Sequence, residues 1–378
     1  MAKKPTKQTK KSSSKSALIN PELFSTAEEV LEEEKNWCVI PWGPAVDSKT
    51  GGGILEGSLV LLQTRAKSGK SLSAMQFAVN ALKQGRKVIY VDAERRLSGY
   101  KYFKINGLDV KDKNLLILRS KKAKEPLIGD DIYSLIKKMM RLPEYRGAVY
   151  IIDSFSSMVP RDTAEDKDVK ASRRDTTPKL NADFLKQIGN ILRTSDSVIV
   201  GIQHLSPDLN NYGALKPDGG EKFQYYSDYV LVSKHSPLNW DGEPVATSGA
   251  NLNGTLIKFN LPYNKMLKPY SDKENPIMSY TKFGEGIWWG REALDLLVNE
   301  IGLVYKTSAT SSWYVVCFPD GTEQKAQGAE KAVAVIEENR DIFENVIKDY
   351  FVQKYGVSYD FKPPQTTEEE AEPNDDEG

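Results

Sequence analysis

Residues 58–71 read Ser-Leu-Val-Leu-Leu-Gln-Thr-Arg-Ala-Lys-Ser-Gly-Lys-Ser, and this stretch decides the fold. Its apolar first half, residues 58–63, predicts a buried strand, and residues 70–83 carry apolar side chains at helical spacing. The join between a strand and a helix leaves backbone N–H groups free to bind an anion. Gly69, Lys70 and Ser71 add a lysine for the β- and γ-phosphates and a hydroxyl for Mg²⁺. We therefore expect a phosphate-binding loop here.

The first position of this loop departs from the usual pattern, because Thr64 stands where a glycine is expected. A β-branched residue resists positive φ, so either the turn is built differently or the loop is degenerate. The strand, the helix and the upstream glycines 51–53 still favour nucleotide binding. The expected contacts are Thr64, Arg65, Ala66, Lys67, Ser68, Gly69, Lys70, Ser71 and Leu72.

Strand-like and helical segments alternate along the rest of the chain, which is typical of an α/β fold. We expect a mostly parallel sheet covered by helices on both faces. The strands are expected at residues 58–63, 87–91, 114–118, 148–152, 197–203, 229–233, 255–261 and 278–282. The helices are expected at residues 25–35, 70–83, 131–140 and 180–192.

The composition changes after residue 283, and the rest of the chain predicts a small α+β lobe. Its expected elements are a helix at 291–300, a hairpin-like piece at 313–319 and helices at 323–338 and 341–353. Six lysines lie within residues 1–17 and seven acids within 366–378, so both ends are expected to be disordered. The predicted division is a basic tail 1–24, an N-terminal helix 25–39, a core 40–283, a lobe 284–355 and an acidic tail 356–378. The tails either solubilise the chain or, at the acidic end, compete with nucleic acid for a basic surface.

Composition excludes several classes of protein. Fifty-two Lys and Arg balance fifty-two Asp and Glu, so net charge gives no indication of a nucleic-acid partner. Two cysteines and two histidines make a disulfide framework or a Cys- or His-rich metal centre implausible. Since no run reaches eighteen apolar residues and the N-terminus lacks an apolar signal core, we expect a soluble, intracellular chain with no membrane partner.

Three polar residues follow predicted strands and are candidates for catalysis. Asp153 follows an apolar strand, where a carboxylate can hold the water shell of Mg²⁺, although it could instead cap a helix with Ser154. Glu94 ends another strand and could act as general base on the attacking water. Gln203 could contact the γ-phosphate and pass that contact to the following loop, or be a plain surface amide.

Two long polar segments, residues 160–177 and 206–222, are expected to be mobile loops, and loops of this length are usually functional. Basic residues with an occasional apolar or aromatic side chain suit single-stranded nucleic acid. A solvated charged loop is the alternative for the first segment. The candidate DNA contacts are Arg161, Lys167, Lys170, Arg173, Arg174, Leu209, Tyr212 and Lys222.

Across roughly residues 40–339 the chain resembles the RecA family of strand-exchange recombinases, and in particular its phage UvsX-like branch. The resemblance rests on the order of short fragments. These include Tyr-Val-Asp-Ala-Glu at 90–94, Ile-Ile-Asp-Ser at 151–154, Gly-Ile-Gln at 201–203 and Lys-Phe-Gly-Glu-Gly-Ile at 282–287.

The resemblance implies a RecA-like ATPase core, with ATP and Mg²⁺ as cofactors and with Glu94, Asp153 and Gln203 in the roles given above. It implies a helical homo-oligomer on single-stranded DNA that pairs with homologous duplex DNA, in the cytoplasm (the host's, if phage-encoded). Single-strand-binding and loader proteins are the further partners implied, and the two polar segments become the DNA-binding loops.

Two departures qualify the resemblance, at the interface lysines and at the start of the phosphate loop. Where bacterial relatives carry two lysines that reach a neighbour's γ-phosphate, this chain has Tyr263-Asn264-Lys265, so Lys265 would act alone or with Lys268 or Lys258. The residue expected to stack on the adenine base is Tyr102 or Tyr100. Thr64-Arg65 is closer to hexameric replicative helicases, so the alternatives are a helicase of the same core or a non-hydrolysing, ATP-gated DNA-binding accessory protein.

Overall fold

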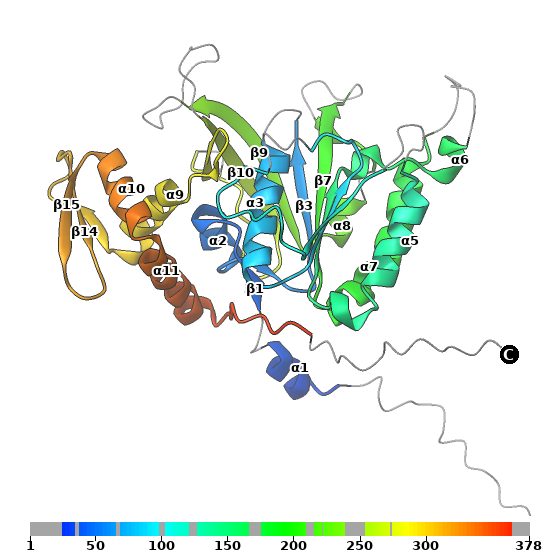
Figure 1. Ribbon diagram of the computed structural model, residues 1–378, viewed down its shortest axis with the longest axis horizontal. Coiled ribbons are helices and arrows are strands. Elements are labelled where there is room, and N and C mark those ends of the chain that lie inside the picture. The colour runs from blue at the N-terminus through cyan, green and yellow to red at the C-terminus, as the bar shows by residue number, and fades with distance from the viewer. Residues whose placement is uncertain are drawn as a thin grey trace, which may run out of the picture.

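A computed structural model describes residues 25–34, 38–65, 69–97, 103–120, 127–165, 175–208, 215–220, 222–238, 254–272 and 274–364. Within it the central sheet has the strand order β12-β11-β10-β9-β3-β7-β6-β4-β5, and β8 pairs with β7 (Figure 1). From β9 to β5 the pairs are parallel, whereas β9, β10, β11 and β12 pair antiparallel. The bounds are β3 (Leu59–Thr64), β4 (Val88–Asp92), β5 (Leu115–Leu118), β6 (Val149–Asp153), β7 (Val198–Pro207), β8 (Leu215–Pro217), β9 (Tyr229–Leu238), β10 (Gly254–Asn264), β11 (Ile277–Lys282) and β12 (Gly286–Ile287).

Helices cover both faces of this sheet, as predicted (Figure 1). Side chains alternate between the faces along a strand, so Val60 and Leu62 of β3 join one hydrophobic cluster and Leu59 and Leu61 join the other. The first cluster contains α3, and the second contains α5 and α7. The helices are α1 (Ala27–Glu34), α2 (Pro44–Thr50), α3 (Lys70–Lys83), α5 (Gly129–Met139), α6 (Arg161–Ala164), α7 (Thr177–Thr194), α8 (Phe223–Tyr226), α9 (Trp289–Leu296), α10 (Ala329–Glu338) and α11 (Arg340–Tyr355).

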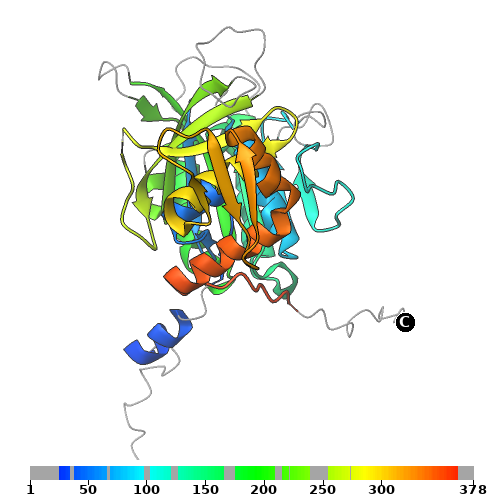
Figure 2. The same ribbon diagram turned by 90° about the vertical axis from the view of Figure 1, so that its left-hand side faces the viewer.

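The C-terminal lobe corrects one predicted element. Residues 323–338 were expected to form one helix, but β15 (Glu323–Gln327) precedes α10. Gly328 separates them with φ 87°, a conformation that no helix continues. The strand pairs with β14 (Trp313–Cys317), which pairs with β13 (Val304–Lys306), so the lobe carries a three-stranded antiparallel sheet that faces the viewer in Figure 2.

The lobe shares its hydrophobic core with the central sheet. Buried side chains of α9, α10 and α11 belong to the same cluster as β3 and α3. At the join, Glu292 of α9 is 1% exposed and accepts hydrogen bonds from the Ser279 hydroxyl at 2.7 Å and from the Ala45 backbone N–H at 3.2 Å. The lobe is therefore fixed to the sheet and to α2.

The expected acidic tail at 356–378 begins with an ordered segment, which is a second correction. Ser358 pairs with Cys38, the Tyr359 hydroxyl donates to the Gly52 carbonyl at 2.6 Å, and the Phe361 ring lies 3.8 Å from the guanidinium carbon of buried Arg86. We call residues 356–364 the C-terminal strap. Its aromatic side chains contact residues that are distant in sequence. The composition of the strap itself does not indicate these contacts.

Helix α1 projects from the body of the molecule (Figure 1). The helix was predicted at residues 25–35, and a capping box at Thr26 begins it. The Glu29 N–H donates to the Thr26 hydroxyl at 3.2 Å, and the Thr26 N–H donates to the Glu29 carboxylate at 2.7 Å. Among the described helices, none is both long and apolar enough to cross a bilayer.

Candidate nucleotide site and loop bases

The phosphate-binding loop lies at the C-terminal edge of the parallel strands. Thr64 is the last residue of β3, fully buried and paired with His204 of β7 and Ser233 of β9. It is therefore part of the sheet and needs no positive φ. The left-handed residue is Gly69, with φ 79°, where a Cβ would lie 2.9 Å from the Ile257 side chain. Gly69 thus supplies a left-handed residue directly before α3, and residues 66–68 lie outside the described ranges.

Lys70 and Ser71 start α3 and face the end of β6. Burial lowers the pKa of Lys70, while the charges of Asp153 and Glu94 act in the opposite direction. Burial raises the pKa of Asp153, opposed by hydrogen bonds from the Ser71 and Tyr90 hydroxyls, the latter at 2.8 Å. The Asp153–Ser154 peptide bond that follows is cis.

These groups fit a magnesium ion, since a hydroxyl and a carboxylate oxygen lie in contact beside the phosphate lysine. In the described part of the chain no group of three or more His, Cys, Asp and Glu side chains could hold a metal by itself. Ser71 and Asp153 would thus hold Mg²⁺ together with water and phosphate oxygens, as Mg²⁺ prefers.

Glu94 lies in the turn after β4 and is surrounded by donors. Its Oε1 accepts hydrogen bonds from Ser157 at 2.8 Å and Ser154 at 2.9 Å, and lies 3.0 Å from Nε2 of His204. Its Oε2 lies 2.8 Å from Nη1 of Arg96. The bond with His204, followed by those from the two serines, lowers the pKa of Glu94 to about 2. The carboxylate is therefore ionised at neutral pH.

Gln203, the predicted γ-phosphate sensor, and its neighbour His204 contact different parts of the structure. Gln203 is fully buried; it accepts a hydrogen bond from Gln63 at 2.8 Å and donates to the carbonyls of Asp218 and Gly220 at 2.9 and 2.7 Å. The next residue, His204, is the one that reaches Glu94. Adjacent residues of a strand point to opposite faces, so only one of them can face the Glu94 carboxylate.

The second predicted loop has an ordered base. Strand β7 runs to Pro207, and β8 returns antiparallel to it with Ser206 opposite Lys216. The predicted stretch at 206–222 is therefore a hairpin in its described part. Gln203 holds the end of this hairpin through the two carbonyls named above.

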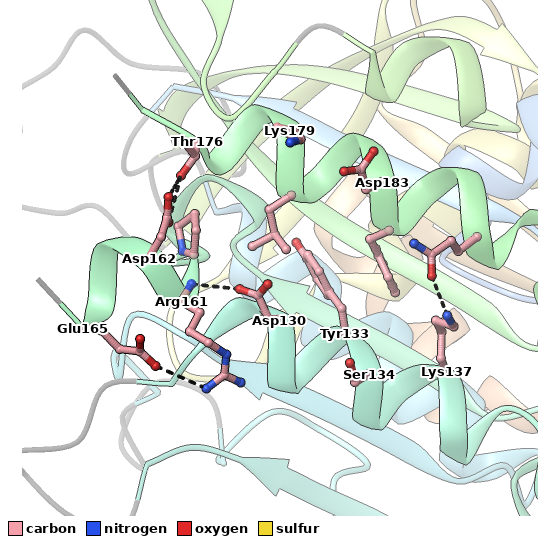
Figure 3. Close-up of a pocket in the computed structure, with 14 residues that line it drawn as sticks. Asp130, Tyr133, Ser134, Lys137, Arg161, Asp162, Glu165, Thr176, Lys179 and Asp183 are labelled. Carbon is pink, nitrogen blue, oxygen red and sulfur yellow. Dashed lines mark hydrogen bonds and ion pairs between the residues drawn. The ribbon is translucent and has the colours of Figure 1, made fainter. Parts of the chain in front are cut away.

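The first predicted loop is partly helical, because Arg161 starts the short helix α6. Beside α6 an open groove of about 610 Å³ runs between α5 and α7 (Figure 3). Arg161 forms ion pairs with Asp131 and Glu165, and its backbone N–H donates to Asp130 at 2.8 Å. It thus fastens α6 to α5, and its role as a DNA contact stays a prediction.

The ends of the first segment lie close together, since the Thr176 hydroxyl donates to Asp162 at 3.1 Å. Residues 166–174, between these ends, fall outside the described ranges. The same holds for other predicted site residues: Ala66, Lys67, Ser68, Tyr100, Tyr102, Lys167, Lys170, Arg173, Arg174, Leu209 and Tyr212. Arg65 and Lys222 are exposed, and Leu72 is half-buried in α3.

Lys265 lies at the edge of the sheet opposite the phosphate loop. It follows β10, whose last residue Asn264 pairs with Tyr229, the first residue of β9. Its Nζ is 3.6 Å from Asp228, which also accepts a hydrogen bond from the Leu59 N–H at the start of β3. Lys265 therefore cannot serve the nucleotide of its own chain.

Sequence reasoning missed His204, Ser154, Ser157 and Arg96 around Glu94. The available signals were two: a histidine directly after a strand in a chain with two histidines, and hydroxyls that follow Asp153 in the run Asp-Ser-Phe-Ser-Ser. Neither indicates which carboxylate these side chains contact, because the contacts join segments far apart in sequence.

Comparison with known proteins agrees with this architecture. A family model described as "ATPase: KaiC" matches residues 43–181. The core has a RecA-like ATPase fold. Proteins named RecA are similar over most of the chain. RecA of Thermotoga maritima is 27% identical over 337 residues (84% of this chain, 83% of the relative), and RecA of Streptomyces coelicolor is 28% identical over 325 residues (84% and 78%).

RecA of Sulfurovum is also similar, with 26% identity over 302 residues (78% of this chain, 77% of the relative). These matches support a distant relationship to the RecA family, nucleotide binding with hydrolysis, and a recombinase-like role.

Proposed function

We propose that the protein is an ATP-dependent DNA recombinase of the phage UvsX-like type, which forms a helical filament on single-stranded DNA and exchanges strands with a homologous duplex. Hydrolysis would be stimulated by DNA. The observation that carries the proposal is the direct connection between Glu94 and the second loop. His204 contacts Glu94, and its neighbour Gln203 holds the carbonyls of Asp218 and Gly220.

This connection supports a switch. When ATP binds, Lys70 takes the β- and γ-phosphates, and a γ-phosphate near Glu94 changes the charge that His204 faces. A shift of His204 moves the end of β7 and with it the hydrogen bonds of Gln203 to the loop. The loop then grips the DNA strand, and hydrolysis reverses the change.

The roles of this chain's own residues follow from their contacts. Ser71 and Asp153 would hold Mg²⁺, which neutralises phosphate charge when bound. Glu94, ionised because its pKa is about 2, orients the attacking water through hydrogen bonds. Lys70, partly desolvated, places its positive charge against the phosphates.

The position of Lys265 supports a site shared between protomers. A lysine at the far edge of the sheet can reach a nucleotide only on another copy, which corresponds to head-to-tail assembly with ATP at the interface. Helix α1, which projects from the body, is the other candidate contact between copies.

Strand exchange between a circular single strand and a homologous linear duplex tests the proposal. We expect joint molecules with ATP and Mg²⁺, and filaments on single strands in electron micrographs. Closed rings that unwind duplexes would instead identify a helicase, the alternative that Thr64-Arg65 favours. DNA binding without ATP turnover would identify an accessory protein.

A further inference from the structure

Arg96 is a cation beside Glu94. It lies in the turn after β4, and buried Asp92 fixes its backbone. The carboxylate of Asp92 accepts the Arg96 N–H at 2.9 Å and the Leu97 N–H at 3.3 Å. Arg95, with φ 51°, turns the chain just before it. The main chain is therefore held in place while the Arg96 side chain remains 75% exposed.

The guanidinium contacts the oxygen of Glu94 that the other donors leave. Oε1 of Glu94 is occupied by His204, Ser154 and Ser157, and Oε2 lies 2.8 Å from Nη1 of Arg96. In this arrangement both carboxylate oxygens are engaged. A water at Oε2 would share that oxygen with Arg96 until Arg96 moves.

Arg96 also lies near Lys70. Its charge contributes to the lowered pKa of Lys70, in the same direction as burial, so the two cations are within electrostatic reach of each other. Because a phosphate-loop lysine contacts the β- and γ-phosphates, a nucleotide bound to Lys70 would bring its γ-phosphate close to Arg96. An ion pair with an exposed arginine contributes little free energy, whereas a guanidinium binds phosphate oxygens with paired, charge-assisted hydrogen bonds.

We propose that Arg96 binds the γ-phosphate of ATP within its own chain, leaving Oε2 of Glu94 when the nucleotide arrives and returning to it when the γ-phosphate departs. The exchange makes ATP itself the agent that frees Glu94 for water. Arg96 would then be a second cation at the γ-phosphate, in addition to Lys265 from the adjacent protomer. In this chain Tyr263 stands where the bacterial relatives have the other interface lysine. This inference rests on the proposed nucleotide site.

The test compares nucleotides that differ in the γ-phosphate. Displacement of a fluorescent nucleotide gives the dissociation constants of ATPγS and ADP for the full-length protein and for Arg96→Ala. We expect ATPγS affinity to fall about tenfold and ADP affinity to change less than about twofold, since the lost charge-assisted bonds involve only the γ-phosphate. Arg95→Ala, a change at the exposed neighbour, should leave both constants unchanged.

Equal losses for ATPγS and ADP, or no loss for either, would overturn the role of Arg96. That outcome is distinct from failure of the nucleotide site, in which the unchanged protein binds neither nucleotide.

A double-mutant cycle with Glu94→Gln tests the exchange itself. Removing the partner of Arg96 should tighten ATPγS binding more in the presence of Arg96 than in the Arg96→Ala background. Equal tightening in both backgrounds refutes the exchange.

Discussion

The side-chain amide nitrogen of Gln203 lies 2.7 Å from the carbonyl oxygen of Gly220, at the end of the second-loop hairpin. The same nitrogen lies 2.9 Å from the Asp218 carbonyl oxygen, and the amide oxygen accepts a hydrogen bond from Gln63. A fully buried amide with these three bonds has one orientation. The last turn of the hairpin is thus tied to the strand that carries His204 to Glu94.

Gln203→Ala should uncouple DNA binding from the nucleotide. The change removes two hydrogen bonds to the hairpin but leaves Lys70 and Ser71 in place. We expect ATPγS affinity to stay near that of the unchanged protein, while the ATPγS-dependent gain in affinity for single-stranded DNA falls about tenfold. Anisotropy of a labelled oligonucleotide with ATPγS and with ADP measures this gain. Gln324→Ala, an exposed amide in β15, is the control, and an undiminished gain in Gln203→Ala contradicts the coupling.

Lys70→Ala should abolish useful nucleotide binding. The ammonium group at the start of α3 lies near Asp153 and Glu94, and its charge-assisted bonds to phosphate would be lost. We expect ATP affinity to fall about a hundredfold, measured by displacement of a fluorescent analogue. Lys331→Ala, at an exposed position of α10, should change nothing. An unaltered ATP affinity in Lys70→Ala would remove the phosphate-loop assignment.

The elements that carry the candidate nucleotide site were predictable because their signals are local. Helix α3 has the bounds expected from its apolar spacing, and Asp153 and Glu94 come from strand ends that parallel pairing brings to one edge. The γ-phosphate sensor was assigned to Gln203 alone. Whether Gln203 or His204 faces the site depends on which side of β7 each occupies, and both neighbouring residues are polar, so local pattern does not decide it.

The other differences also depend on partners distant in sequence. Residues 323–327 have a helical composition, but pairing with β14 makes them a strand that buries Ala326. The C-terminal strap holds Tyr359 and Phe361 in a polar stretch, and their partners Gly52 and Arg86 lie about three hundred residues earlier. The ion pair of Arg161 with Asp131 joins two helices, so the local sequence does not indicate it.

Glu94→Gln should separate binding from turnover. Glutamine keeps an oxygen for Ser154 and Ser157 but lacks the charge that a pKa of about 2 maintains on Glu94. We expect ATP-dependent binding to single-stranded DNA to persist, while phosphate release falls at least about a hundredfold. A coupled phosphate assay with saturating DNA measures the rate, and Glu330→Gln, exposed on α10, serves as control. Turnover at the original rate would exclude Glu94 as the base.

Two truncations should separate the acidic tail from the C-terminal strap. Deleting residues 366–378 removes seven acids but keeps the strap, so duplex DNA affinity should rise severalfold at low salt. The gain should shrink as salt shortens the Debye length from about 10 Å at 0.1 M. Deleting residues 356–378 also removes the contacts of Tyr359 and Phe361, and should lower Tm by several degrees. A flat duplex affinity in the shorter truncation would leave the tail a solubiliser.

Stability should fall as pH rises between about 4.5 and 7, in part because of Glu292. Burial raises the pKa of this carboxyl to about 7, so the folded protein retains a proton that the unfolded chain has already lost above its ordinary pKa of 4.5. The free energy of unfolding therefore decreases with pH through that window, by at most about 3 kcal/mol.

Urea unfolding of the unchanged protein and of Glu292→Gln, at pH 5 and pH 8, measures the difference. Glutamine does not titrate, so the free energy of unfolding of Glu292→Gln lacks this contribution from Glu292. Relative to Glu292→Gln, the unchanged protein should therefore be less stable at pH 8 than at pH 5. A constant difference would mean that the Ser279 and Ala45 hydrogen bonds keep Glu292 ionised throughout.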